Sequence, residues 1–154
     1  MKIGVISDTH NFLDPKVPAL FEGVAHIFHG GDIGMRSLLL ELGLVAPVTA
    51  VMGNTDQGAV RLRETEVLEL GGRKFLVHHI LNPRAAADTI KLRIERERPD
   101  VVVFGHSHKP FCETIGKTLY LNPGYAGKSR FGMERSVAIL HCNAEEVRPE
   151  FLML

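Results

Sequence analysis

Short apolar runs that each stop at a cluster of polar residues recur along this chain. They lie at residues 3–6, 25–28, 47–52, 74–80 and 100–104. Apolar runs of this length, bounded by turn residues, predict buried strands. Apolar residues at helical spacing between the runs predict helices at 17–24, 38–42 and 82–98. Strands that alternate with helices predict a largely parallel sheet, whose strand ends line up along one edge.

The third predicted helix has the clearest boundary signals. Asn82 is a suitable N-cap with Pro83 at the first helical position, and Pro99 ends the helix. Ala87, Ile90 and Ile94 share the face that we expect to be buried.

The last third of the chain changes character. Four strands with short turns are predicted at 111–115, 118–121, 136–142 and 147–152. Consecutive short-turned strands favour an antiparallel second sheet. Because no linker or repeat interrupts the chain, we predict a single domain over residues 1–154.

The charge, hydropathy and cysteine content of the chain exclude some classes of function. The 18 Lys and Arg residues balance the 18 Asp and Glu residues, so no overall charge attracts the chain to long nucleic acid or to an acidic membrane. No apolar stretch is long enough to span a membrane. The two cysteines form no CxxC pair, which favours reduced thiols in a cytoplasmic protein.

The polar residues at the strand ends are the candidate chemistry. Asp8 and His10 follow the first run and, being two residues apart, point to the same side. This pair alone also fits a helix cap or a turn. Other strand ends carry similar donors, however: Asp32, Asn54, His78, His106 and His108. Oxygen and nitrogen donors without thiolate suit Mn²⁺, Fe or Zn²⁺, and their number predicts two ions that share a carboxylate.

These motifs resemble those of the calcineurin-like metallophosphoesterase superfamily, in particular its branch of small single-domain phosphodiesterases and Vps29-like proteins. The matching motifs are Asp8-x-His10, Gly31-Asp32, Gly53-Asn54-x-Asp56, His78 and Gly105-His106-Ser107-His108. The resemblance implies an α/β fold, a four-layer αββα sandwich. In it two mixed β-sheets pack face to face with helices on the outside and the metal site at the strand C-terminal ends.

The resemblance also implies a division of the ligands between two divalent ions, with Mn favoured over Fe, Zn, Ni or Co. Asp8, His10 and His108 would hold one ion. Asn54, His78 and His106 would hold the other, with Asp32 bridging. Asp56 is expected to orient a histidine ligand from behind, and His29 to support the site without binding metal.

The implied activity is metal-dependent hydrolysis of a small phosphodiester, with a metal-bridging hydroxide as nucleophile. Asp32, Asn54 and His79 are the candidate catalytic residues. Thr55 stands where larger members have a histidine that protonates the leaving group. We hypothesise that His79 supplies this proton or contacts substrate; the alternative is a strand residue that faces away from the site.

Two cations in a glycine-rich loop, Lys128 and Arg130, are candidate contacts for the substrate phosphate, or else belong to a solvated loop. Two other functions stay open: a catalytically weak Vps29-like scaffold that binds proteins, and a hydrolase with a single metal. The presence of every predicted ligand favours the enzyme with two metals. A homodimer is compatible with this branch.

Overall fold

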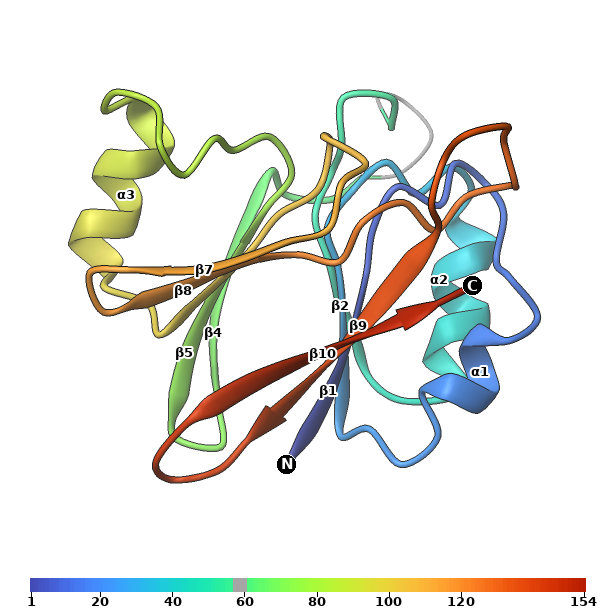
Figure 1. Ribbon diagram of the computed structural model, residues 1–154, viewed down its shortest axis with the longest axis horizontal. Helices are drawn as coiled ribbons and strands as arrows, with labels where there is room; N and C mark the ends of the chain where they lie inside the picture. Colours follow the sequence, from blue (N-terminus) through green and yellow to red (C-terminus); the bar gives the residue numbers. More distant parts are fainter. Residues whose placement is uncertain (57–60) are drawn as a thin grey trace.

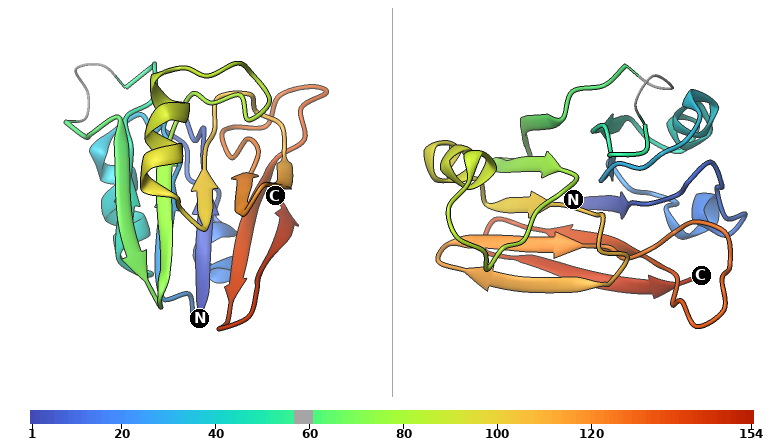
Figure 2. Two further views of the ribbon diagram at one scale, coloured as in Figure 1. Left: turned by 90° about the vertical axis from the view of Figure 1, so that its left-hand side faces the viewer. Right: turned by 90° about the horizontal axis from the view of Figure 1, so that it is seen from above.

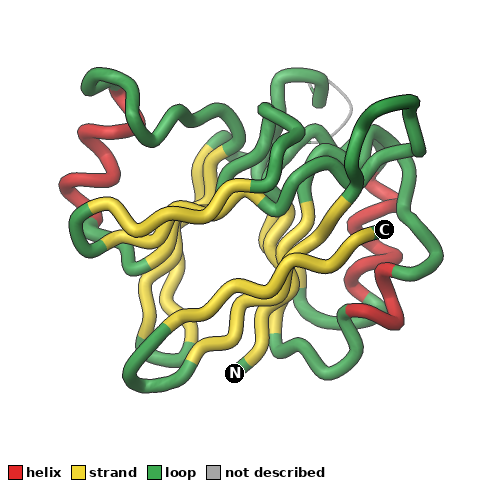
Figure 3. The backbone as a smooth tube through the Cα atoms, viewed as in Figure 1, coloured by secondary structure: helices red, strands yellow, loops and turns green. Residues whose placement is uncertain are grey.

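The computed structural model describes residues 1–56 and 61–154, and its strands form two five-stranded sheets (Figures 1 and 3). The first sheet has the order β10-β9-β1-β2-β3, formed by Val147–Met153, Ser136–Cys142, Lys2–Ile6, His26–His29 and Val48–Ala50. The second has the order β4-β5-β6-β8-β7, formed by Thr65–Leu70, Arg73–His78, Val101–Val103, Thr118–Asn122 and Phe111–Ile115.

Helices cover the outer faces of the two sheets. The helices α1 (Val17–Leu20) and α2 (Arg36–Gly43) pack on the first sheet, whereas α3 (Thr89–Glu97) packs on the second. Figures 1 and 2 show α3 on one side of the molecule and α1 and α2 on the other, with the sheets between them. The predicted four-layer sandwich is confirmed.

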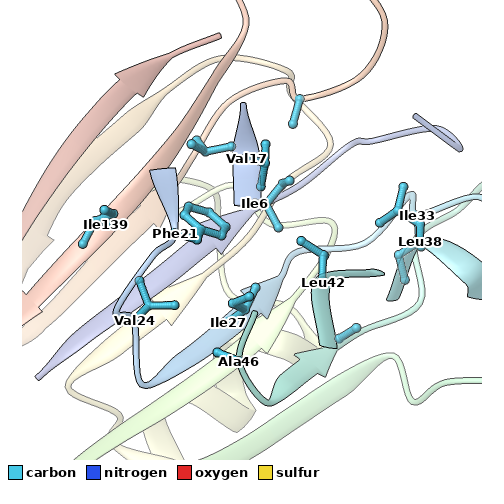
Figure 4. Close-up of a cluster of buried hydrophobic side chains, with 13 residues drawn as sticks. Ile6, Val17, Phe21, Val24, Ile27, Ile33, Leu38, Leu42, Ala46 and Ile139 are labelled. Carbon is cyan, nitrogen blue, oxygen red and sulfur yellow. The ribbon is translucent and has the colours of Figure 1, made fainter. Parts of the chain in front are cut away.

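Both faces of the central strands are buried, which explains their continuous apolar runs. Along β1, Ile3 and Val5 face the second sheet and contact a core that includes Phe75. Ile6 faces the opposite way, into the cluster under α1 and α2 that contains Phe21 (Figure 4). Because side chains alternate along a strand, one run can supply two cores.

The parallel strands of both sheets end at the same end of the molecule. The strands β1, β2 and β3 run parallel in the first sheet, as do β5, β6 and β8 in the second. Their carboxyl ends lie at the top of Figure 1, where the connecting loops gather. The fold therefore brings the polar residues of five strand ends to one edge, as the sequence predicts.

The last third of the chain does not form a sheet of its own, so that prediction is wrong. Its four strands have nearly the predicted bounds, but they form two hairpins in different sheets. The hairpin β7-β8 joins the second sheet, with β8 parallel to β6. The hairpin β9-β10 joins the first, with β9 antiparallel to β1. Short turns specify local pairing but not the sheet that a hairpin extends.

The predicted start of the third helix is also wrong. Asn82 Oδ1 accepts a hydrogen bond from the Arg84 amide at 3.1 Å, which makes a turn rather than a helix start. The N-cap is Asp88, whose Oδ1 accepts from the Lys91 amide at 2.9 Å. Ala87 is consequently exposed in the preceding loop, and only the predicted end before Pro99 is confirmed.

In the part of the chain that the structure describes, no helix is both long and apolar enough to cross a membrane.

Candidate metal centre

Two clusters of ligand atoms lie side by side at the carboxyl ends of the strands. Asp8, His10 and His108 form the first cluster, in which the potential ligand atoms all lie within 4.8 Å of one another. Asp32, His79 and His106 form the second by the same measure. Asp32 also reaches the first cluster, since its Oδ2 lies 3.8 Å from His10 Nε2 and 3.3 Å from His79 Nε2. Asp32 Oδ2 therefore lies between the two clusters.

One carboxylate oxygen of Asp8 accepts hydrogen bonds, whereas the other has no hydrogen-bond partner among the described residues. Its Oδ2 accepts hydrogen bonds from the Ser7 hydroxyl at 2.6 Å and from the His106 amide at 3.1 Å. Its Oδ1 is buried, has no hydrogen-bond partner among the described residues, and lies 3.3 Å from His108 Nε2. Burial raises the pKa of Asp8, against the opposing effects of the Ser7 hydroxyl and the nearby imidazoles. A cation beside Oδ1 would satisfy this oxygen and stabilise the carboxylate.

His79 is held so that one ring nitrogen faces only acceptors. Its Nδ1 lies 2.6 Å from the carbonyl oxygen of Gly30 and must donate to it, so in the neutral ring Nε2 carries the lone pair. That Nε2 lies 3.1 Å from Asn54 Oδ1 and 3.3 Å from Asp32 Oδ2. Three acceptor atoms therefore converge, and a divalent cation would satisfy all of them. The donor set, with oxygen and imidazole nitrogen and no thiolate, fits such an ion.

Asn54 and Asp32 are connected to the turns around them. Asn54 Oδ1 also lies 3.0 Å from His106 Nδ1, which joins the amide to the exposed histidine of the second cluster. Asp32 Oδ1 accepts from the Thr55 amide at 2.9 Å. Burial pushes the pKa of Asp32 upward, but the Thr55 hydrogen bonds and the neighbouring imidazoles outweigh it and lower the pKa. Asp32 is therefore held in its charged form.

The structure exchanges the positions predicted for His78 and His79. His79 is buried in the second cluster, whereas His78 Nδ1 lies 2.9 Å from the Thr65 hydroxyl on β4. The expected place of His78 among the ligands is thus corrected, because neighbouring residues on an extended chain face opposite sides. The sequence alone does not give the strand phase, because Phe75, Leu76 and Val77 are all apolar. In the structure Phe75 and Val77 face the inner core, and His79 continues their alternation.

Asp56 and His29 lie beneath the ligand atoms, although the hydrogen-bond partners of Asp56 differ from those predicted. The Asp56 carboxylate accepts from the backbone amides of Ile33, Gly34 and Gly53, at 2.9–3.1 Å, and not from a histidine. It joins the turns that carry Asp32 and Asn54.

The fully buried His29 fixes the turn after β2. Its Nδ1 accepts from the Gly31 amide at 3.2 Å, so its Nε2 donates to the Thr9 hydroxyl at 3.0 Å. Burial lowers the pKa of His29 to about 3, so the ring is neutral. The prediction that His29 lies behind the ligands agrees with this position, and its supporting role remains a prediction.

Five of the site residues have a left-handed backbone, which is rare outside glycine. The φ angles are 55° at Asp8, 44° at His10, 53° at Asp32, 67° at His106 and 58° at His108. Each such residue costs about 1–2 kcal/mol. Strain gathered at one place points to function, because the surrounding contacts must maintain it.

Two glycines make room for the carboxylates. A Cβ atom at Gly53 would lie 2.1 Å from both the amide nitrogen and Oδ1 of Asp32. A Cβ atom at Gly105 would lie 2.1 Å from Ser7 Oγ and 2.7 Å from Asp8 Oδ2. No larger residue fits either position without displacing a potential ligand.

Tyr125 packs beneath the first cluster and was not among the predicted site residues. Its ring centroid lies 4.8 Å from that of His108 and 6.1 Å from that of His10. The side chain is fully buried, and its hydroxyl has no hydrogen-bond partner among the described residues. The Arg130 guanidinium lies 5.7 Å from the Tyr125 ring, at the rim of the cluster, and Lys128 is exposed nearby in the chain.

Comparison with known proteins identifies the family. A profile of the calcineurin-like phosphoesterase superfamily domain matches residues 1–145, and the chain belongs to this superfamily. A probable metallophosphoesterase of Methanothermobacter thermautotrophicus is 32% identical over 99% of this chain and 92% of its own length. A phosphodiesterase of Methanocaldococcus jannaschii is 29% identical over 80% of this chain and 83% of its own.

Solved structures agree on the fold. A predicted phosphoesterase from Streptococcus pneumoniae matches with a TM-score of 0.77 and 26% identity, over 99% of this chain and 88% of that one. Wild-type Vps29 from Entamoeba histolytica matches with a TM-score of 0.74 and 24% identity, over 99% of both chains. The chain is thus a metallophosphoesterase by family, with candidate metal-binding residues at the expected strand ends.

Proposed function

We propose that this chain is a phosphodiesterase that uses two divalent metal ions, with Mn favoured over Fe, Zn, Ni or Co. The observation that carries the proposal is the pair of adjacent clusters that meet at Asp32 Oδ2. Membership of the superfamily supports it, and so does the relative that is named a phosphodiesterase.

Each cluster would hold one ion. Asp8, His10 and His108 surround one position, and Asn54, His79 and His106 surround the other. Asp32 would contribute to both. When bound, such ions supply a water nucleophile that is deprotonated near neutral pH, and they neutralise the charge of the phosphoryl group.

The residues of the chain position this centre and keep one side open. Asp8, Asp32 and His79 are buried, whereas Asn54 and His106 are exposed and His10 and His108 are partly exposed. Substrate would therefore approach over the histidines, not through the sheets. The bond from Nδ1 of His79 to Gly30 fixes Nε2 as the atom available for coordination.

The preferred substrate class follows from the lack of a general acid at Thr55. Its hydroxyl cannot serve as a general acid at neutral pH, and the buried Nδ1 proton of His79 is already bonded to Gly30. We therefore no longer assign proton donation to His79. Diesters with acidic leaving groups, which need no proton, should be the better substrates.

Hydrolysis of bis(p-nitrophenyl) phosphate tests the proposal. Metal-stripped protein should be inactive, Mn²⁺ should restore turnover, and Asp32→Asn should abolish it. Glu41→Gln, at an exposed acid on α2, removes the same charge elsewhere and should keep full activity.

The alternative is a scaffold of the Vps29-like kind that binds proteins. Folded protein that binds metal but hydrolyses no diester with Mn²⁺, Ni²⁺, Co²⁺ or Zn²⁺ would reject the enzyme and favour the scaffold. One ion per chain in the active protein would instead indicate a hydrolase with a single metal.

A further inference from the structure

A cleft opens directly beside the first cluster. It has a volume of about 630 Å³ and is lined by residues 107–110, which follow β6, and by residues 131–134, which precede β9. His108 belongs to both the cleft and the first cluster. A molecule with its phosphate at the clusters would therefore have this cleft beside it.

The cleft has an aromatic side chain that the fold does not use. Phe131 is fully exposed, at 109% of its reference area, and lies in none of the buried clusters found among the described residues. Pro110 and Met133 provide further apolar surface, and Lys109 provides a cation. Exposed apolar surface next to a reactive centre is typical of a site for the organic part of a ligand.

The remaining lining suits a planar, polar-edged group better than an aliphatic chain. Ser107 and Glu134 add a hydroxyl and a carboxylate to the same cleft. Nucleobases combine a flat face that stacks on aromatic rings with an edge of hydrogen-bond donors and acceptors. An aliphatic ester chain could form no hydrogen bond with either side chain.

We propose that this cleft, bounded by Phe131 and Pro110, binds the nucleobase of a nucleotide phosphodiester whose phosphate lies at the two clusters. The inference rests on the proposed phosphodiesterase function and gives it a substrate class. Phe131 provides the stacking face, and Lys109 lies close enough to His108 in the chain to add positive charge near the phosphate.

Two esters with the same leaving group test the inference kinetically. Thymidine 5′-(p-nitrophenyl phosphate) carries a base, whereas methyl p-nitrophenyl phosphate does not. We expect kcat/KM to be about tenfold higher for the nucleotide, because stacking of a base on an aromatic ring strengthens binding by roughly this factor. Phe131→Ala should remove this preference and leave the rate with the methyl ester unchanged, while Phe131→Trp should retain it.

The matched control is Leu92→Ala, at an exposed apolar residue on α3, which lies on the far side of the molecule (Figure 1). It should leave both rates unchanged. Equal rates for the two esters in the wild type, or a preference that survives Phe131→Ala, would overturn the inference while leaving the phosphodiesterase function standing. If the wild type hydrolysed neither ester, this result would contradict the proposed phosphodiesterase function itself.

Binding gives a readout that does not depend on turnover. Calorimetric titration of the Mn²⁺-treated protein should show AMP binding about tenfold more tightly than ribose 5-phosphate, which has the phosphate but no base. Phe131→Ala should make the two affinities equal. Equal affinity in the wild type, or no binding of AMP, would contradict the inference.

Discussion

At the scale of single residues, two adjacent histidines have different surroundings and therefore different expected effects. His79 Nε2 faces Asp32 and Asn54, whereas His78 is bonded to Thr65 on the outer side of β5. His79→Gln should weaken metal binding at the second cluster by about a hundredfold or more, since a ligand is worth at least as much as the groups that orient it. His78→Gln should leave it intact.

Calorimetric titration with Mn²⁺ measures both variants, and thermal unfolding checks that each is folded. The first cluster should keep its ion in His79→Gln. Equal loss of binding in the two variants, or a loss confined to His78→Gln, would show that the two histidines have the opposite roles.

Much of this site was predictable residue by residue, because the donors occupy strand ends. Asp8, His10, Asp32, Asn54, His106 and His108 lie together as the motifs implied. The choice between His78 and His79 depended on strand phase, which the continuous apolar run before them does not specify and which the structure supplies. Asp56 could not be assigned correctly, because its partners are backbone amides, two of which lie on a turn remote in sequence.

At the scale of elements, the turns after the strands set the position of the ligands. Gly53→Ala would place a methyl group 2.1 Å from the backbone and carboxylate of Asp32. We expect a loss of roughly 1–3 kcal/mol in the free energy of unfolding, as for other overpacked sites, together with weaker metal binding.

The matched substitution is Gly43→Ala at the end of α2, where an added Cβ would meet no atom within 4 Å. It should stabilise the protein by up to about 1 kcal/mol, because alanine loses less backbone entropy in a helix. Urea unfolding measures both effects. If Gly53→Ala proved as harmless as Gly43→Ala, the close approach to Asp32 would be without consequence.

Strands and hairpins were the most predictable elements, since each has a local signal. The hairpin of β4 and β5 turns at Gly71-Gly72, and β5 lies within one or two residues of the expected run at 74–80. The assignment of β7-β8 and β9-β10 to different sheets was not predictable from turns, because it depends on which sheet edge each hairpin meets. The start of α3 was missed because Asn82 and Asp88 are both good caps, and only the second begins a helix.

At the scale of the whole molecule, folding depends on burying a neutral histidine. Burial lowers the pKa of His29 to about 3, whereas its ordinary value is 6.5. Between these values the unfolded chain binds a proton that the folded chain excludes. Stability is therefore complete above pH 6.5 and falls as the pH decreases toward 3, by up to about 1.4 kcal/mol per pH unit for this one proton.

Urea unfolding of the metal-free protein at several pH values between 4 and 7 measures this dependence. His29→Gln cannot be protonated and can still hydrogen-bond, so its stability should fall less steeply with acid than that of the wild type. Identical slopes for the two proteins would mean that His29 is not the buried proton-excluding group.

If two ions share Asp32, each cluster binds one of them, and His79 is a ligand of the second. The most direct measurement is a crystal structure of the Mn²⁺-loaded protein, with anomalous diffraction at the manganese edge. We expect two anomalous peaks, one among Asp8, His10 and His108 and one among Asn54, His79 and His106, both in contact with Asp32. A single peak, or a peak bound by His78 in place of His79, would contradict it.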